Sequence, residues 1–469
     1  MKFSMNIMPI FALSSTIVLS GGCAVKQAND NGNSNNAKSS SLYSSGFQHK
    51  IITAKNKVFP AVVYIRGVQE NLEYGKTTAN TVIGSGVIIK ETGEVLTNWH
   101  VVNKMKNIRC QLQNGKGYNA TLIGEDKDTD IALLQLKLTE GEKLEHVAKI
   151  RTDDNIKEGD FVMAMGAPWG LNRSVSIGII SCANRYLSKN SNYSLWYQTD
   201  ASISPGNSGG PLVDSQGRVI GINTLGISSG GNIGFTIPST TILKIIPRIR
   251  KWGKVNWAWT GIQLQPLHDF NLDIDFDYDN GVMISSVEPN SPAFEVGLKA
   301  RDRIVKINNT DVTANTLEDI PALNSMLGLA PFDQEMTVII VRRGSKMTFK
   351  FKPREKGASE GKELELKRWN MTVKTINQFD NPELYFHRKK GLFIFGIDSP
   401  GNADNSELQE ADIITKINGK EIKTLDDMQK IYDEAVKNVK EKSKILITVI
   451  RGGLLRQVIL DFSRDYDRE

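Results

Sequence analysis

Between residues 58 and 238, short apolar runs recur at regular intervals and are separated by turns rich in Gly, Asn and Asp. Runs such as VVYIRGV and SVSIGII alternate between apolar and polar residues, which is the period of a half-buried β-strand. Evenly spaced strands with such turns are typical of a β-sandwich or a pair of β-barrels. This half of the chain is therefore predicted to be mainly β. The run at 240–252 has helical spacing and predicts a closing helix, which Pro247 kinks or ends.

Beyond residue 257 the chain contains two similar segments. The segments that begin at Gly281 and Gly391 carry matching Gly, Leu, Asp, Ile and Asn residues at a constant separation of 110 residues. Each continues into an amphipathic run, 316–327 or 424–435, that predicts a short helix. Such internal similarity predicts two copies of one module.

Residues 199–213 read TDASISPGNSGGPLV and place Ser208 between glycines. Glycines beside a serine allow backbone N–H groups to converge where an oxyanion would form. We therefore predict Ser208 as a nucleophile, with the N–H groups of Gly206 and Ser208 as oxyanion donors. Taken by itself, the motif could also be an ordinary Gly/Ser turn.

Two further residues complete a possible catalytic set. His100 follows an apolar run in VLTNWHVV, and Asp130 precedes one in DTDIALLQL. A serine hydroxyl needs an imidazole to take its proton, and an aspartate can hold that imidazole in the correct tautomer. The chain order His100, Asp130, Ser208 is the order of chymotrypsin-like double barrels. Each residue separately could have a structural role, but the three together predict a catalytic triad.

The motifs GSGVII, VLTNWHVV, DTDIALLQL, GAPWGL, SIGIIS, GNSGGPLV and GNIGFTIP together resemble the HtrA/Deg family of envelope serine proteases. The resemblance extends from about residue 58 to the end of the chain. It implies a mainly β protein, with a chymotrypsin-like double β-barrel followed by two α+β PDZ domains. It also implies ATP-independent cleavage of unfolded or misfolded cell-envelope proteins, regulated by peptides that bind the PDZ domains.

The predicted organisation follows from these patterns. Residues 1–22 form a signal peptide of the lipoprotein type, 23–46 a disordered tether, and 47–253 the protease domain. A first module at 257–354 and a second module at 362–464 resemble PDZ domains.

The resemblance assigns residues to two binding sites. Ile203, Ile227 and Ile233 match the wall of the substrate pocket, so cleavage after Val, Ile or Ala is expected. In the first module, the peptide site comprises Gly261, Ile262, Leu264, Leu323 and Leu327. The second module has 369–372 at the equivalent loop, and whether it binds peptide is left open.

The N-terminus has an apolar run at 7–19, too short to span a bilayer, followed by Ser-Gly-Gly before Cys23. We expect lipidation of Cys23 and a periplasmic, membrane-anchored protein of the bacterial cell envelope; the alternative is plain secretion. The next segment is rich in Asn and Ser and lacks the apolar residues needed for a core.

Composition excludes several other classes. The net charge of +6 is spread over 469 residues without a long basic patch, so no nucleic-acid partner is expected. No Cys or His spacing suits a metal, and no cofactor is expected. Cys110 and Cys182 fall in different predicted barrels, so two buried free thiols are favoured over a disulfide.

The expected partners are unfolded proteins, C-terminal peptides and other copies of the chain, because family members commonly form trimers or multiples of them. The competing hypothesis is a protease-like chaperone or PDZ peptide-binding adaptor with little proteolysis.

Overall fold

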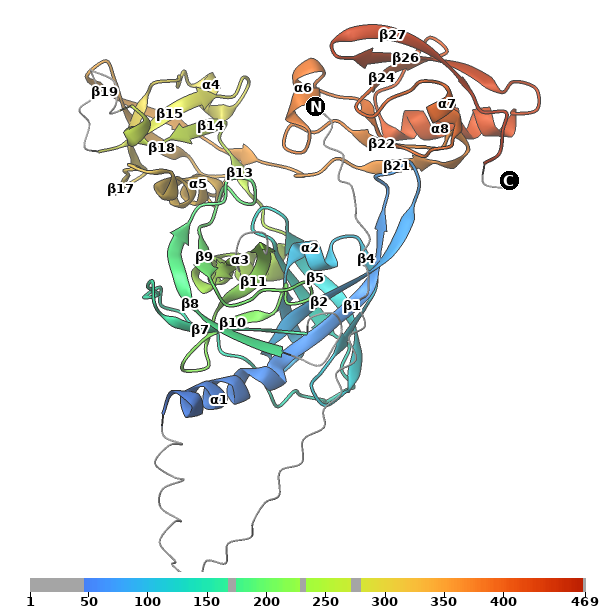
Figure 1. Cartoon of the computed structure of the whole chain (residues 1–469). Helices are drawn as coiled ribbons and strands as arrows, with labels where there is room; N and C mark the ends of the chain where they lie inside the picture. Colours follow the sequence, from blue (N-terminus) through green and yellow to red (C-terminus); the bar gives the residue numbers. More distant parts are fainter. Residues whose placement is uncertain (1–45, 168–173, 228–232, 271–279, 467–469) are drawn as a thin grey trace, which may run out of the picture. The chain divides into compact units, whose positions relative to one another are not determined.

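The structure is a computed structural model that describes residues 46–167, 174–227, 233–270 and 280–466 (Figure 1). The predicted signal peptide, Cys23 and nearly all of the predicted tether lie outside the described residues. Residues 50–469 form one compact unit, to which the following description applies. No helix within the described ranges is long and apolar enough to cross a membrane.

The first half of the protease region is a closed barrel with strand order β1-β2-β3-β6-β5-β4. Its interior is apolar because alternate residues of each strand point inward; Val63, Ile65 and Val87 are fully buried. The strands are β1 (Val62–Asn71), β2 (Thr78–Lys90), β3 (Glu94–Thr97), β4 (Met105–Gln111), β5 (Gly117–Asp126) and β6 (Ile131–Leu136).

A second closed barrel follows, with strand order β10-β11-β12-β9-β8-β7. The paired barrels confirm the predicted mainly β, chymotrypsin-like architecture (Figure 1). Its strands are β7 (Phe161–Gly166), β8 (Ser174–Arg185), β9 (Trp196–Thr199), β10 (Pro211–Asp214), β11 (Val219–Ile227) and β12 (Ile233–Pro238).

Helix α3 (Ser239–Trp252) follows the second barrel and packs against the first. It continues past Pro247 and ends at Gly253, which has a left-handed φ of 71°. The Arg250 guanidinium binds the Glu94 carboxylate at the start of β3, with Nε at 2.9 Å from Oε1. Burial would raise the pKa of Glu94, but Arg250 and Lys90 outweigh it and lower that pKa. Among the described residues of this region, the other helices are α1 (Phe47–Val58), η1 (Phe59–Ala61) and α2 (Trp99–Val102).

The first module contains a sheet with the order β14-β15-β16-β18-β19, and β17 pairs with β16. Its helix α5 lies over an apolar core that includes Leu323 and Ile340. Its elements are β13 (Ala258–Trp259), β14 (Ile262–Gln265), η3 (Leu267–Asp269), β15 (Val282–Val287), α4 (Pro292–Glu295), β16 (Arg303–Ile307), β17 (Thr310–Asp311), η4 (Leu317–Asp319), α5 (Ile320–Gly328), β18 (Met336–Arg342), β19 (Ser345–Phe351) and β20 (Arg354–Glu355).

The second module repeats this arrangement but has one more strand at its edge, in the order β21-β22-β23-β24-β26-β27. Both modules have a capping box before the main helix, at Thr316 and Thr424. The elements are β21 (Glu363–Leu366), η5 (Lys367–Trp369), β22 (Met371–Thr375), α6 (Pro382–His387), β23 (Leu392–Ile397), α7 (Asn402–Asn405), β24 (Ile413–Ile417), β25 (Lys420–Glu421), α8 (Leu425–Lys437), β26 (Lys444–Arg451) and β27 (Leu454–Asp461).

Candidate active site

His100 and Asp130 are hydrogen-bonded to each other in the first barrel. The imidazole Nδ1 lies 2.9 Å from Asp130 Oδ2 and 3.0 Å from Oδ1, and the His100 backbone N–H donates to Oδ1 at 3.0 Å. An ionised carboxylate only accepts hydrogen bonds, so this contact places the proton of a neutral imidazole on Nδ1. Nε2 is then free to act as a base.

Asp130 lies in a tight turn between β5 and β6 and has a φ of 57°, a left-handed conformation that Asp tolerates. The carboxylate of Asp126 supports this turn: it accepts from the N–H of Thr129 at 2.9 Å and from its Oγ1 at 2.6 Å. Burial, and then the charge of Asp128, raise the pKa of Asp126 to about 7. Its other oxygen accepts from Trp257 Nε1 at 2.8 Å, so the turn is also linked to the start of the first module.

The hydroxyl of Ser208 donates to the backbone carbonyl of Thr224 at 2.9 Å. Among the described residues, no hydrogen bond joins Ser208 to His100. A chain of contacts nevertheless brings the two barrels together here, because the Asn98 amide donates to both Thr224 Oγ1 and the Asp130 carbonyl at 3.0 Å. All three predicted triad residues therefore lie close to this contact between the barrels.

The loop around Ser208 is fixed by a residue of the other barrel, Ser85. Its N–H donates to the Ser208 carbonyl at 2.8 Å, and its hydroxyl donates to the Gly206 carbonyl at 2.6 Å. That hydroxyl also accepts from the Ala167 N–H at 2.8 Å. Within the described part of the chain, the N–H groups of Gly206 and Ser208 donate to no other group. Gly206 adopts a left-handed φ of 99°, which glycine tolerates without steric strain.

The predicted substrate pocket lies beside two paired glycines, Gly226 in β11 and Gly234 in β12. The side chain of Ile203 lies over them: a Cβ atom added at Gly234 would be 2.6 Å from Ile203 Cδ1. Ile233 is half-buried in the neighbouring position of β12. Ile227 ends β11, but its side chain is not among those the structure describes. Ile203 and Ile233 therefore place apolar side chains beside the paired glycines.

In the first module, a groove of about 210 Å³ contains three of the predicted peptide-binding residues, Gly261, Ile262 and Leu264. Leu327 of α5 also lines it. Leu323 lies in the core of the module instead, and Ile320 and Asn324 of α5 line the groove. The wall opposite includes residues from outside the module: Tyr193 of the protease, Lys356 and Phe379.

Tyr193 connects this groove to the protease. Its ring stacks on Trp257 with centroids 3.9 Å apart, and the ammonium of Lys356 lies 5.2 Å from its centroid. The same ammonium binds the carboxylate of Asp128 at 2.8 Å. Asp128 is two residues before Asp130. Lys356 therefore contacts both the peptide groove and the turn that carries Asp130, the predicted aspartate of the triad.

The sequence analysis did not identify Ser85, Asn98 or Thr224 as parts of this site. A partial signal exists, because Ser85 stands in GSG and Asn98 two residues before His100. Their partners, however, are more than a hundred residues away.

The two predicted thiols are free. Cys110 is buried in β4, and burial raises its pKa to about 12, which makes it unreactive. Cys182 in β8 is only half-buried, contrary to the prediction that both would be buried.

Comparison with known proteins agrees with this geometry. Residues 84–222 match the model of a trypsin-like peptidase domain, and residues 255–328 match that of a PDZ domain. A probable periplasmic serine endoprotease, DegP-like, of Marinomonas sp. (strain MWYL1) is 32% identical over 379 residues, which are 79% of this chain and 77% of that protein. A protein with the same description from Buchnera aphidicola subsp. Schizaphis graminum (strain Sg) is 33% identical, over 79% of this chain and 74% of its own length.

Solved structures are similar as well. The HtrA-type protease AlgW with a tripeptide has a TM-score of 0.56 and 29% identity, over 64% of this chain and 96% of that chain. The same protease with a decapeptide also has a TM-score of 0.56, with 27% identity over 66% and 99% of the two chains. With its paired barrels, its PDZ domain and relatives at this level of identity, the chain is a chymotrypsin-like serine protease and belongs to the HtrA family.

Proposed function

We propose that the chain is an ATP-independent endopeptidase that degrades unfolded or misfolded proteins of the cell envelope. The observation that supports this most directly is the hydrogen bond between His100 Nδ1 and Asp130, near the contact between the barrels at which Ser208 also lies. In this proposal Ser208 is the nucleophile, His100 the general base and Asp130 the group that orients the imidazole.

Catalysis begins with a change in the position of the serine hydroxyl. In the structure it donates to Thr224, so rotation about the Cα–Cβ bond must bring Oγ to His100 Nε2. Oγ then attacks the peptide carbonyl while its proton passes to Nε2, and the carbonyl π electrons move to the oxygen. When the tetrahedral adduct collapses, the C–N bond breaks and the leaving amine takes the proton from Nε2. Water hydrolyses the acyl-enzyme by the same route.

The N–H groups of Gly206 and Ser208 would stabilise the oxyanion of this adduct. Removal of one such donor in serine proteases costs about 100-fold to 1000-fold in kcat. The hydrogen bonds from Ser85 to the carbonyls of Gly206 and Ser208 support this assignment, because they fix the loop that carries the two N–H donors.

If Ile203 and Ile233 form the wall of the substrate pocket, that pocket favours small or medium aliphatic residues at the cleavage site, namely Val, Ile or Ala. Discrimination should be modest, because one methylene in an apolar pocket is worth about 1–3 kcal/mol. Cleavage-site profiling of an unfolded protein should therefore give Val and Ile as the main residues, and dominance of Arg or Asp would contradict this assignment.

The first module would bind the C-terminus of a peptide by β-augmentation on β14, with Gly261 and Ile262 at the carboxylate and Leu264 and Leu327 along the groove. Tyr193 and Lys356 connect this groove to the protease and support regulation of the active site by bound peptide. The site is proposed to lie in the periplasm, as the names of the relatives indicate, on a chain lipidated at Cys23 and assembled into trimers or multiples of them.

A protease-like chaperone or peptide-binding adaptor is the second candidate. One observation favours it: the Ser208 hydroxyl is bonded to Thr224 rather than to His100. Cleavage of casein and labelling by a fluorophosphonate distinguish the two functions. The protease proposal expects cleavage, labelling at Ser208 identified by mass spectrometry, and loss of both in Ser208→Ala with casein binding retained. Absence of cleavage and labelling in the parent chain, with and without peptides ending in an apolar residue, would favour the adaptor.

A further inference from the structure

The two modules differ at the edge that receives a peptide. In the first module, β14 is the last strand of its sheet, so its outer edge can accept an added strand. The strand before it, β13, pairs instead with β20 at the end of the module. In the second module the corresponding edge is not free.

Strand β22 is the counterpart of β14. Ile262 pairs with Val287 in the first module as Met371 pairs with Ile397 in the second, and each strand has an irregularity one residue later. The preceding loops also match: Gly261 and Asn370 both have left-handed φ values, of 77° and 54°. The edge of β22 that faces away from β23 therefore corresponds to the peptide-receiving edge of β14.

That edge of β22 is occupied by β21. The two strands pair antiparallel over four residues, with Leu364 opposite Val373 and Leu366 opposite Met371. Only residues 367–370 separate them, so the loop that would hold a peptide carboxylate is itself the turn of this hairpin. A free chain terminus could reach this loop only after β21 had left.

The side chains of β21 fill the groove. Leu366 is fully buried, and Leu364 packs on the same apolar core, which contains Met371, Val373 and Met428 of α8. Val373 of β22 is fully buried, whereas its counterpart in the first module, Leu264 of β14, is half-buried. The groove is therefore covered in the second module and partly exposed in the first.

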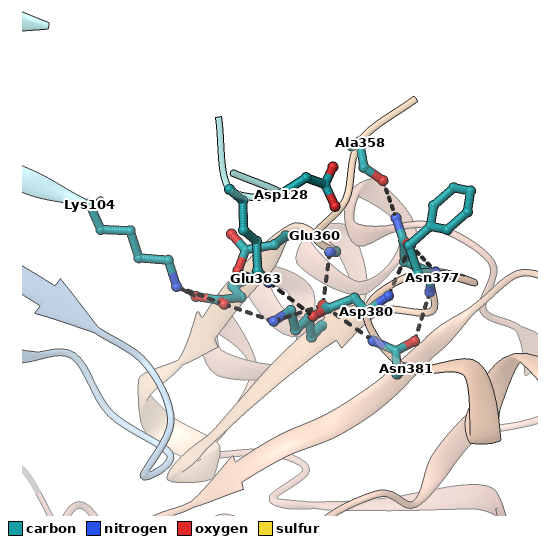
Figure 2. Close-up of polar contacts among 12 residues, drawn as sticks. Lys104, Asp128, Ala358, Glu360, Glu363, Asn377, Asp380 and Asn381 are labelled. Atoms are coloured by element: carbon teal, nitrogen blue, oxygen red, sulfur yellow. Dashed lines mark hydrogen bonds and ion pairs between the residues drawn. The ribbon is translucent and has the colours of Figure 1, made fainter. Parts of the chain in front are cut away.

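Because strand residues alternate between faces, the glutamates of β21 point away from this core. Glu363 Oε2 lies 2.7 Å from Lys104 Nζ of the protease, and the side chain of Glu363 is only 8% exposed. Glu365 accepts from the N–H and hydroxyl of Thr77 at 2.7 and 2.6 Å. Figure 2 shows Lys104 directed at Glu363, beside the polar cluster around Asp380.

We propose that β21 is an internal ligand of the second module. It occupies the groove with its leucines and binds the protease with its glutamates, so the chain takes up one terminal peptide, in the first module, and not two. The second module then has a structural role: through β21 and β22 it binds the turn between β1 and β2 of the protease. The statement that the first module binds a peptide rests on the proposed function. The statement that the groove of the second module is occupied rests only on the pairing of β21 with β22.

Hydrogen exchange on the full-length Ser208→Ala chain tests this without disturbing the fold. The probes are decapeptides ending in Leu, Val or Phe, with C-terminally amidated copies as controls. We expect the β22 amides to be protected without peptide and unchanged with it, and the β14 amides to gain protection only with free carboxyl termini. Peptide-dependent protection in β22, or unprotected β22 amides in the free chain, would overturn the proposal.

Calorimetric titration gives the number of sites. We expect one peptide per chain, and none after Gly261→Ala, because a Cβ atom there would be 2.1 Å from Ser291 Cβ. One remaining site in Gly261→Ala would show that the second module binds peptide and would contradict the proposal. If the parent chain binds none of the probes, the peptide site of the first module fails, but the protection of β22 still tests the internal ligand.

Discussion

Ser85, a buried residue of the first barrel, binds the loop that carries Ser208 through both its backbone and its side chain. Its backbone and its side chain each bind one carbonyl of the nucleophile loop, on either side of Asn207. The peptide units on both sides of the predicted oxyanion donor Ser208 N–H are therefore fixed from the opposite barrel. The same hydroxyl accepts from Ala167, at the start of the next loop. We regard Ser85 as a positioning residue.

Ser85→Ala should lower kcat by roughly tenfold to a hundredfold, less than the loss of a direct oxyanion donor, and should leave KM nearly unchanged. The control is Thr97→Val, which removes a buried hydroxyl that donates to the Ser85 carbonyl at 2.7 Å. Ser85→Ala loses two hydrogen bonds and Thr97→Val loses one, each worth about 1 kcal/mol of stability, but only Ser85→Ala should slow labelling by a fluorophosphonate. Equal kcat values for the two variants would reduce Ser85 to a structural role.

Asp126 should make stability depend on pH in an unusual direction. Its pKa is raised from 3.8 to about 7 in the folded chain, so the folded state holds a proton that the unfolded state loses. This contribution is complete below pH 3.8 and is lost as pH rises to about 7. The melting temperature of Asp126→Asn should therefore rise relative to that of the parent as the pH is raised from 4.5 to 8. The control Asp311→Asn changes an exposed carboxylate and should show no such rise. If the difference in melting temperature between Asp126→Asn and the parent chain does not change with pH, Asp126 does not titrate in this range.

At the scale of elements, local patterns were sufficient for much of the fold. The alternating runs predicted the strands of both barrels, and the internal repeat predicted two similar modules, because both signals are contained in short stretches. The contact between His100 and Asp130 was predictable from their motifs. The bonds from Ser85 to Gly206 and from Asn98 to Thr224 were not, since they depend on how the barrels pack. Strand β21 also escaped prediction, because its pairing depends on a groove formed by other residues.

The two modules share a buried ion pair whose strength can be measured. Asp302 and Asp412 are almost completely buried, and each accepts two hydrogen bonds from an arginine, Arg342 and Arg451 respectively. Loss of one partner leaves an uncompensated charge inside the module. Arg451→Met should therefore cost about 2–3 kcal/mol in the opening free energy of β24 and β26, measured by native-state hydrogen exchange.

Adding Asp412→Asn to Arg451→Met should recover a large part of this loss, because the buried charge is removed. The control Arg456→Met changes an exposed arginine of β27 and should leave exchange in β24 and β26 unchanged. If Arg451→Met behaves like this control, the ion pair contributes nothing to the stability of the second module.

At the scale of the whole molecule, charged contacts join residues 356–363, where the first module leads into the second, to the segments that carry His100 and Asp130. Lys356 binds Asp128, and Lys127 binds Glu360. Lys104 binds Glu363 (Figure 2). Lys374, opposite Glu363, is buried; burial alone would lower its pKa, but the nearby Asp380 and Glu363 raise it. Glu363 has the least exposed side chain of these three contacts, at 8%, so the loss of Lys104 would leave a nearly buried carboxylate with one partner fewer.

A double-mutant cycle of Lys104→Met and Glu363→Gln tests this contact. Each single change should weaken the docking of β21 on the protease and speed exchange of the amides at 72–78, which lie against the second module through the bond from Thr372 Oγ1 to the Leu72 carbonyl. Because the two side chains interact directly, the double variant should be no worse than the single ones, with a coupling energy of about 1–2 kcal/mol. Lys106→Met removes an exposed ion pair with Glu70 inside the protease and should have no such effect. Strictly additive effects of Lys104→Met and Glu363→Gln would mean that the contact between Lys104 and Glu363 does not help to hold β21 on the protease.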